Sequence, residues 1–288
     1  MNQKSNQQNY YNNADSIVAD GAVPVLISNQ FAFTEGPAAD KEGNVYFTDQ
    51  PNNTIWKYNT GGKLSIFTDQ SNRSNGMFFD ENGNLLSCAD EFNQLILIKP
   101  GGEKTVLVND LDNEKLNGPN DVWKSVDGHI YFTDPLYERP YWKTKPARVK
   151  GEYVYVIAKG NSKPQVVIND YVKPNGLIGT PDGKILYVAD IGGNKTYRFT
   201  IEPDGSLSNK TLFANEGSDG MTIDNLGNIY LTGNGVNVYN KEGKKIRHIA
   251  ISQPWTANVC FGGSKKNILF ITASTAIYSL QMNVQGVN

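Results

Sequence analysis

A repeat of about 45 residues runs through the chain and limits the folds open to it. Each repeat has a short polar start, an apolar run, a turn rich in Gly and Asn, and a second apolar run. The six segments are "EGPAADKEGNVYFTD", "NGMFFDENGNLLSCAD", "NDVWKSVDGHIYFTD", "NGLIGTPDGKILYVAD", "DGMTIDNLGNIYLTG" and "NVCFGGSKKNILFIT". Their first residues are 40, 45, 55, 44 and 39 residues apart. Such even spacing is typical of architectures built from one repeated unit.

Most repeats add two further strand-like runs, such as "TIWKYN" and "KLSIFT" in the first. Four short antiparallel strands in about 45 residues are the signature of a propeller blade. The sequence therefore predicts an all-β fold, a six-bladed β-propeller with four-stranded blades. The last repeat ends with three strands at "AIYSLQM", and the run "AVPVLIS" at residues 22–28 is expected to supply its outer strand. Closure by an N-terminal strand would hide a sheet edge.

Residues 21–288 are expected to form this single propeller domain. Residues 1–20 are polar, rich in Asn and Gln, and aperiodic, so they are predicted to be a disordered lead-in. The two cysteines, Cys88 and Cys260, are too few for a disulfide framework and are expected to be free thiols.

The charge and hydropathy of the chain limit the classes of partner that it is expected to have. A formal net charge of −2 gives no indication of a nucleic-acid partner. No apolar run approaches the ~20 residues of a membrane helix, so a soluble protein without a membrane partner is predicted. A periplasmic or secreted location is expected if a signal peptide has been removed, and a cytoplasmic one otherwise. The oligomeric state is left open.

The first strand of each blade lines the central channel of a propeller, so the first residues of the six repeats should form a ring at one mouth. These ring residues all carry oxygen and none is cationic: Glu35, Asn75, Asn120, Asn175, Asp219 and Asn258. Two carboxylates near one axis repel each other, and a divalent cation would relieve that repulsion. An all-oxygen donor set favours calcium or magnesium over zinc. The alternative is that short polar residues simply fill a narrow, solvated channel.

Other catalytic signals are few. His129 and His248 lie inside strand patterns, which argues against a Ser-His-Asp triad and against a histidine-ligated zinc. One insertion stands out, "PLYERPYWKTKPARVKGEY" in the third repeat, which contains Tyr137, Tyr141 and Trp142. It is expected at the same mouth as the ring, either as a rim that covers and selects a substrate or as an ordinary surface loop.

Several motifs, in order, resemble the gluconolactonase and senescence-marker-protein (regucalcin) family of six-bladed propellers. They run from "FTEGPAAD" through "NGPNDVW", "IYFTDPLY", "KPNGL", "LYVADIG" and "SDGMTID" to "TANVCFGG", and cover nearly the whole chain. The resemblance implies a calcium-type divalent ion at the channel mouth, with magnesium or zinc as alternatives. Its ligands would be Glu35, Asn175 and Asp219, with Asn120 as a fourth ligand or a substrate contact.

The sequence departs from the family at two places. Animal members carry an Arg two residues before the Asn of the third blade, where this chain has Gly118. Bacterial gluconolactonases often have a Cys-Glu-His run where this chain has Cys88, Ala89 and Asp90. Both departures concern the identity of the substrate and leave the metal ligands in place.

The leading hypothesis is a metal-dependent hydrolase that opens sugar-acid lactones such as gluconolactone, with the ion stabilising the oxyanion as water attacks. A carboxylate must take the proton of the water. Asp219 is the first candidate, because the family assigns it a dual role as ligand and base. Glu35 is the second candidate and Asp121 the third.

The substrate would be a small-molecule lactone held by side chains of the ring and the insertion. Asn120 and Asn258 are expected to bind its hydroxyl groups, and Tyr137 and Trp142 to pack on its ring face. Two alternatives stay open. The same site could act on aryl esters or phosphotriesters, since its four-residue pattern resembles diisopropylfluorophosphatase and the paraoxonases. The chain could also be a non-catalytic calcium-binding propeller.

Overall fold

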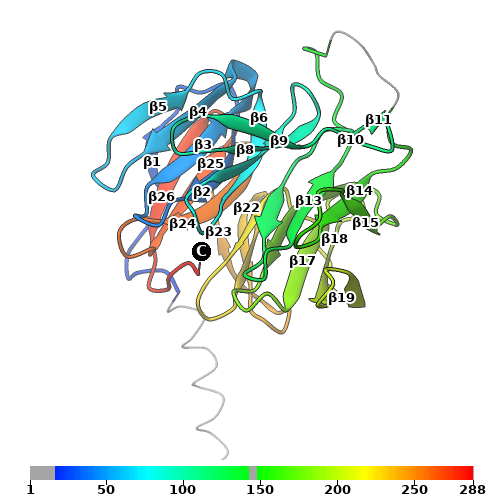
Figure 1. Cartoon of the computed structure of the whole chain (residues 1–288). Coiled ribbons are helices and arrows are strands. Elements are labelled where there is room, and N and C mark those ends of the chain that lie inside the picture. The colour runs from blue at the N-terminus through cyan, green and yellow to red at the C-terminus, as the bar shows by residue number, and fades with distance from the viewer. Residues whose placement is uncertain (1–16, 143–147, 288) are drawn as a thin grey trace, which may run out of the picture.

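Six four-stranded antiparallel sheets surround a common centre in the computed structural model, which describes residues 17–142 and 148–287 (Figure 1). The first three blades consist of β2 (Thr34–Ala39), β3 (Val45–Asp49), β4 (Thr54–Tyr58) and β5 (Leu64–Thr68); β6 (Ser74–Phe79), β7 (Leu85–Ala89), β8 (Gln94–Ile98) and β9 (Lys104–Val108); and β12 (Val122–Lys124), β13 (Ile130–Asp134), β14 (Tyr153–Ile157) and β15 (Gln165–Ile168). The next two consist of β16 (Pro174–Gly179), β17 (Ile185–Asp190), β18 (Lys195–Ile201) and β19 (Leu207–Ala214); and β20 (Met221–Ile223), β21 (Ile229–Gly233), β22 (Gly235–Tyr239) and β23 (Lys245–Ile249).

The sixth blade joins the two ends of the described chain. It consists of β24 (Asn258–Gly262), β25 (Ile268–Ala273), β26 (Ala276–Gln281) and, as the outer strand, β1 (Val25–Ser28). β1 runs antiparallel to β26, with Val25 opposite Ser279 and Leu26 opposite Tyr278. The predicted six-bladed propeller, closed by an N-terminal strand, is therefore confirmed.

The N-terminal segment includes two buried aliphatic residues. Residues 1–16 lie outside the described residues, but Ile17 and Val18 are only 1% and 4% exposed. Both belong to the hydrophobic cluster of the fifth and sixth blades, and Val18 forms an isolated bridge with Met282. Ile17 and Val18, which fall within the predicted lead-in, thus pack against the propeller. Two aliphatic side chains suffice to bind the segment, although the composition around them is polar.

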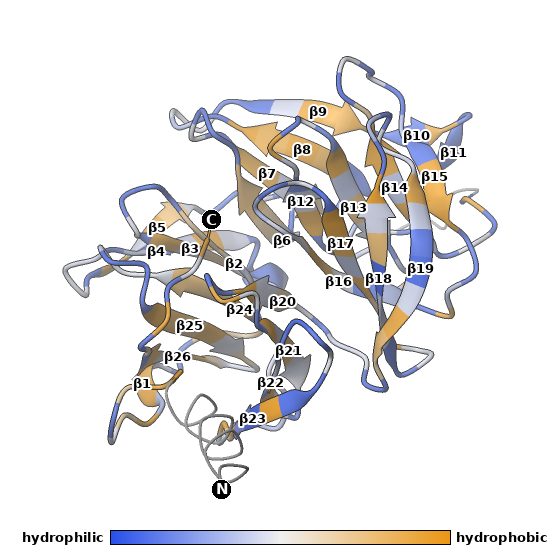
Figure 2. Cartoon of the chain, turned by 90° about the horizontal axis from the view of Figure 1, so that it is seen from below, coloured by the Kyte–Doolittle hydropathy of each residue, from blue (hydrophilic) through white to orange (hydrophobic). Residues whose placement is uncertain are grey.

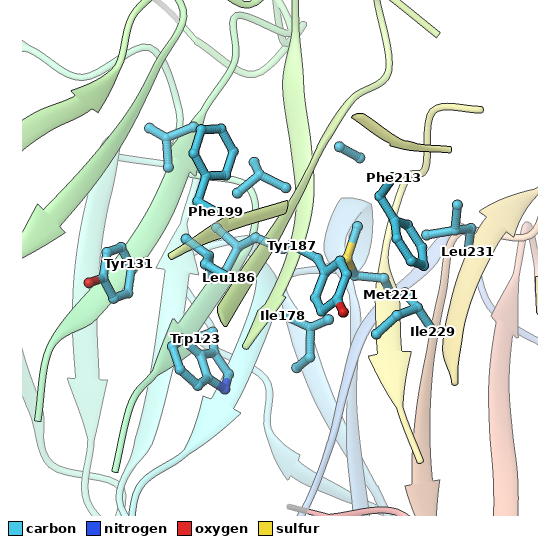
Figure 3. Close-up of a cluster of buried hydrophobic side chains, with 14 of the residues drawn as sticks. Trp123, Tyr131, Ile178, Leu186, Tyr187, Phe199, Phe213, Met221, Ile229 and Leu231 are labelled. Carbon is cyan, nitrogen blue, oxygen red and sulfur yellow. The ribbon is translucent and has the colours of Figure 1, made fainter. Parts of the chain in front are cut away.

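The largest core cluster lies between the third, fourth and fifth blades (Figure 3). Trp123 and Tyr131 of the third blade face the fourth, and Tyr187 of the fourth contacts Phe213 with ring centroids 4.8 Å apart. Because both faces of a blade pack on neighbours, the second strand of each blade is almost fully buried. The outer strands β19 and β23 carry the hydrophilic residues (Figure 2).

A few smaller elements interrupt this plan. The 3-10 helix η1 (Gln50–Asn52) follows β3, and a short hairpin of β10 (Asp110–Leu111) and β11 (Glu114–Lys115) lies between the second and third blades. Cys88 and Cys260 are free thiols. Within the described part of the chain, no helix has the length and apolar character needed to cross a membrane.

Candidate metal centre and active site

The six ring residues lie at or just before the innermost strands β2, β6, β12, β16, β20 and β24, which contact one another in sequence around the axis. The first, second and fourth of these strands have an irregularity in register at the ring position, which begins at Glu35 in β2 and includes Asn75 in β6 and Asn175 in β16. A bulge breaks the alternation of a strand and redirects a side chain. All six ring residues are buried, with exposed fractions between 2% and 9%.

A glycine follows four of the six ring residues, and the packing of the inner strands explains it. A Cβ atom on Gly36 would lie 1.9 Å from the carbonyl oxygen of Asn75, and one on Gly176 would lie 2.4 Å from that of Asp219. Only glycine lets the backbone of the next blade approach so closely. The Asn-Gly pair at Asn175 therefore begins a strand because one residue supplies the ring and the next makes room for the neighbouring blade.

A cavity of about 230 Å³ opens at this mouth. Its lining consists of Phe33, Glu35, Gln50, Asn75, Asn120, Tyr137, Arg139, Ile191, Asp219 and Trp255. Four of the predicted site residues therefore share one cavity: Glu35, Asn120, Tyr137 and Asp219. Two others contact this lining. Asn175 Nδ2 donates a hydrogen bond to the hydroxyl of Tyr137 at 3.1 Å, and Asn258 Nδ2 donates one to Glu35 Oε2 at 3.2 Å.

Two amide oxygens of the ring, Asn75 Oδ1 and Asn175 Oδ1, are buried without a hydrogen-bond partner in the structure. A buried unpaired acceptor costs about 1–3 kcal/mol. Among the described residues no three Asp, Glu, His or Cys side chains group as metal ligands, since the ring has two carboxylates and its other members are amides. Buried carboxylates and orphaned amide oxygens are the donors that a hard divalent cation requires, so the residues present fit such an ion.

Burial perturbs every carboxyl group at the axis. Burial, and then repulsion from Asp219, raises the pKa of Glu35 well above its usual range. Burial raises the pKa of Asp219 to about 6, against hydrogen bonds from Trp255 and Asn175 that lower it. Burial also raises the pKa of Asp121 to about 7, although the backbone N–H groups of Leu177 and Val122 oppose the change. The ionised forms of these groups need a compensating positive charge.

Residues 33–275 match the model of the SMP-30/gluconolactonase/LRE-like region. The chain belongs to this family. It is similar to the gluconolactonase of Zymomonas mobilis, with 25% identity over 93% of this chain and 84% of that protein. A solved gluconolactonase of Xanthomonas campestris has a TM-score of 0.85 at 25% identity, over 93% of this chain and 91% of its own. Regucalcin of Agrobacterium tumefaciens, a calcium-binding protein, shares the fold with a TM-score of 0.76 at 19% identity, over 91% of this chain and 94% of its own.

Trp255 is one of five lining residues that the sequence did not predict as part of the site; the others are Phe33, Gln50, Arg139 and Ile191. Trp255 Nε1 donates a hydrogen bond of 2.6 Å to Asp219 Oδ2, and the residue is 38% exposed at the mouth. Trp255 lies in the loop between β23 and β24, outside the repeated pattern. The only signal is its place in "QPWTANV", three residues before the ring position Asn258.

Trp142 does not line the cavity. Its Nε1 donates to the backbone oxygen of Asp90 at 2.8 Å, and the guanidinium of Arg148 lies 4.1 Å from its ring centroid. The insertion thus contacts the second blade and brings Tyr137 and Arg139 to the mouth. Its described part consists of residues 135–142 and 148–153. The indole that lines the cavity is that of Trp255.

The histidines lie away from the ring. His129 is buried, and its Nδ1 accepts a hydrogen bond from the backbone N–H of Lys159. His248 Nδ1 lies 2.7 Å from Asn237 Oδ1. Neither lines the cavity at the mouth. Among the described residues that line this cavity there is no imidazole, and the carboxyl groups are those of Glu35 and Asp219.

Proposed function

We propose that this chain is a divalent-cation-dependent hydrolase that opens sugar-acid lactones such as gluconolactone. The observation that carries the proposal is that two buried carboxyl groups, those of Glu35 and Asp219, share one cavity with unpaired amide oxygens beside them. These oxygens belong to Asn75, which lines the cavity, and to Asn175, which contacts its lining at Tyr137. The gluconolactonases of Zymomonas mobilis and Xanthomonas campestris, similar over more than nine-tenths of this chain, support lactone hydrolysis as the reaction class.

Glu35, Asn120, Asn175 and Asp219 would hold the cation. When bound, it would supply Lewis-acid stabilisation of the negative charge that develops on the lactone carbonyl oxygen. The oxygen-only donor set supports calcium, with magnesium and zinc as alternatives. The calcium-binding regucalcin of Agrobacterium tumefaciens, which has the same fold, is consistent with that choice.

Asp219 is the proposed general base that takes the proton of the attacking water. In the absence of a cation, burial raises its pKa to about 6, and the Trp255 N–H holds one of its oxygens in place. Glu35 is the second candidate, and its Oε2 already accepts bonds from the Gly36 N–H and Asn258. Asp121 is the weakest of the three. Both its oxygens accept backbone N–H bonds, and it lines a cavity on the opposite face.

The lactone would be oriented by the polar part of the lining. The Tyr137 hydroxyl accepts a hydrogen bond from Asn175, so its own proton is free to be donated to a substrate oxygen. Asn120 is held by its backbone, because its N–H donates to Thr133 and its carbonyl accepts from Gly76. We propose that both contact the lactone, and that Asn258 acts through Glu35. Trp255 takes the ring-packing role expected of Trp142.

The test is lactone hydrolysis by chelated protein, followed by addition of calcium, magnesium or zinc. Turnover of gluconolactone should vanish on chelation and return with the cognate ion. Full turnover by metal-free protein would contradict the mechanism. Rates measured in parallel on an aryl ester and on a phosphotriester test the alternative substrates, which no feature of the cavity favours. A protein that binds calcium without hydrolysing any of them would be the non-catalytic propeller.

A further inference from the structure

Arg139 is the only basic residue among the described ones that line the cavity at the mouth. Its side chain is 23% exposed, and its Nε donates a hydrogen bond of 2.6 Å to Asp90 Oδ2. Within residues 17–142 and 148–287, its two terminal amino groups donate no hydrogen bond. A guanidinium held by Nε alone keeps donors available for a ligand.

The carboxylate of Asp90 holds that guanidinium through its Nε atom. This carboxylate is 3% exposed, and Oδ2 also accepts hydrogen bonds from the Tyr141 hydroxyl at 2.7 Å and from Gln50 Nε2 at 3.1 Å. The Trp142 indole bonds the backbone oxygen of the same residue. Tyr141 and Trp142 already attach the insertion to the second blade, so that attachment does not by itself require an arginine at the cavity.

A second cation, Lys173, lies near Arg139 on the Tyr137 side, and its Nζ is 3.7 Å from Glu152 Oε2. The guanidinium lies 5.5 Å from the centroid of the Tyr137 ring, and Lys173 Nζ lies 4.5 Å from the same centroid. The space beside Gly118 is closed, because a Cβ there would lie 2.6 Å from Asp90 Oδ1 and 3.5 Å from Trp142. The positive charge at this side of the mouth therefore comes from Arg139 of the insertion and from Lys173, which precedes β16, and not from the segment before β12 that carries Asn120.

We propose that Arg139 binds a carboxylate carried by the lactone at the end away from its carbonyl group, with Asp90 as the positioning residue. The inference rests on the proposed lactonase function and narrows its substrates to lactones of acidic sugars. A planar guanidinium with two free amino groups matches the two oxygens of a carboxylate. The negative charges of Glu35 and Asp219 would meanwhile be balanced by the divalent cation, so they would not repel the ligand.

The test compares D-glucono-1,4-lactone with D-glucaro-1,4-lactone, which share a ring and differ in a terminal CH2OH or carboxylate. Wild-type protein should have a kcat/KM at least ~10-fold higher for the carboxylate lactone, as expected of a charge-assisted bidentate contact. Arg139→Met should bring the ratio of the two kcat/KM values close to one. The ratio is the readout because the positive charge of Arg139 also lowers the pKa of Asp219, so its loss affects both lactones alike. Arg73→Met is the matched control. Arg73 stacks on Tyr141 in the same region but does not line the cavity, so the preference should persist.

Asp90→Asn tests the positioning role. It should raise KM for the carboxylate lactone while kcat stays within about threefold, since Asp90 acts on orientation and not on the reacting atoms. An equal loss on both lactones in Arg139→Met, or a wild-type enzyme without preference, would overturn the inference and leave lactonase activity standing. If wild type opens neither lactone, the proposed function fails. Calorimetric binding of the glucarolactone then decides the role of Arg139, and equal affinities in wild type and Arg139→Met would refute it.

Discussion

At the scale of single residues, the surroundings of Asp219 determine the pKa of its carboxyl group. Burial raises its pKa, whereas the indole N–H of Trp255 lowers it through a 2.6 Å hydrogen bond. The ring position of Asp219 could be predicted from the repeat, and its candidacy as base from the family resemblance. The partnership with Trp255 could not, because it depends on where a loop outside the repeat folds.

Asp219→Ala should lower kcat/KM for gluconolactone by at least ~100-fold, because the change removes a proposed ligand and the proposed base together. His129→Ala and His248→Ala are the controls, and each should keep most of the activity of wild type. The measurement is steady-state lactone hydrolysis by folded variants. Retention of more than half the activity in Asp219→Ala would exclude it as base, and a collapse in either histidine variant would show an unrecognised role.

Trp255→Phe should move the acidic limb of the pH–rate profile to higher pH. The lost N–H no longer stabilises the ionised form of Asp219, so the pKa of that carboxyl group rises and a higher pH is needed to ionise the base. The rate at neutral pH should fall by about threefold to thirtyfold. Trp142→Phe, which contacts Asp90 instead, should leave the limb where it is. A limb that moves to lower pH in Trp255→Phe would refute the assignment.

At the scale of elements, the inner strands show which parts of the site follow from a local pattern. Each "polar residue then glycine" start predicts an axial side chain, and four of the six starts have that glycine in contact range of the next blade. The insertion obeys no such pattern. Its direction is set by Asp90, which lies far from it in sequence, so tertiary contacts alone decide that Arg139 reaches the cavity and Trp142 does not.

Gly176→Ala should destabilise the protein by about 1–3 kcal/mol, because the added methyl group lies 2.4 Å from the Asp219 carbonyl oxygen and the backbone of the fifth blade must shift. Gly101→Ala is the control, since a methyl group there meets nothing within 4 Å. Denaturant unfolding of both variants is the measurement. Equal stabilities would mean that the inner strands are not packed as tightly as the structure has them.

At the scale of the whole molecule, the axis concentrates acidic groups in the centre of the fold. Glu35, Asp121 and Asp219 are all buried and all have raised pKa values. A folded protein of this kind retains protons that its unfolded chain has already released. Its stability without a cation must therefore depend on pH.

The melting temperature of chelated protein should fall as the pH rises from about 5 to 8. Above their ordinary pKa near 4 these carboxyls ionise in the unfolded chain, whereas Asp121 stays largely protonated in the folded protein until its pKa of about 7. Added calcium should flatten the fall and, at ~100 times its Kd, add about 2.7 kcal/mol of stability. Calorimetric melting curves across this range are the check. A melting temperature that rises over the same range in chelated protein would mean that the folded axis does not retain these protons.

The pairing of β1 with β26 also determines when the propeller can close during synthesis of the chain. Blades one to five are each complete once a continuous stretch of chain has emerged from the ribosome, but β1 is synthesised among the first strands and its partner last. Pairing of such distant segments is the slow, entropically costly kind. Until β26 has been synthesised, β1 remains an unpaired edge that can pair with strands of other chains, and the propeller cannot close.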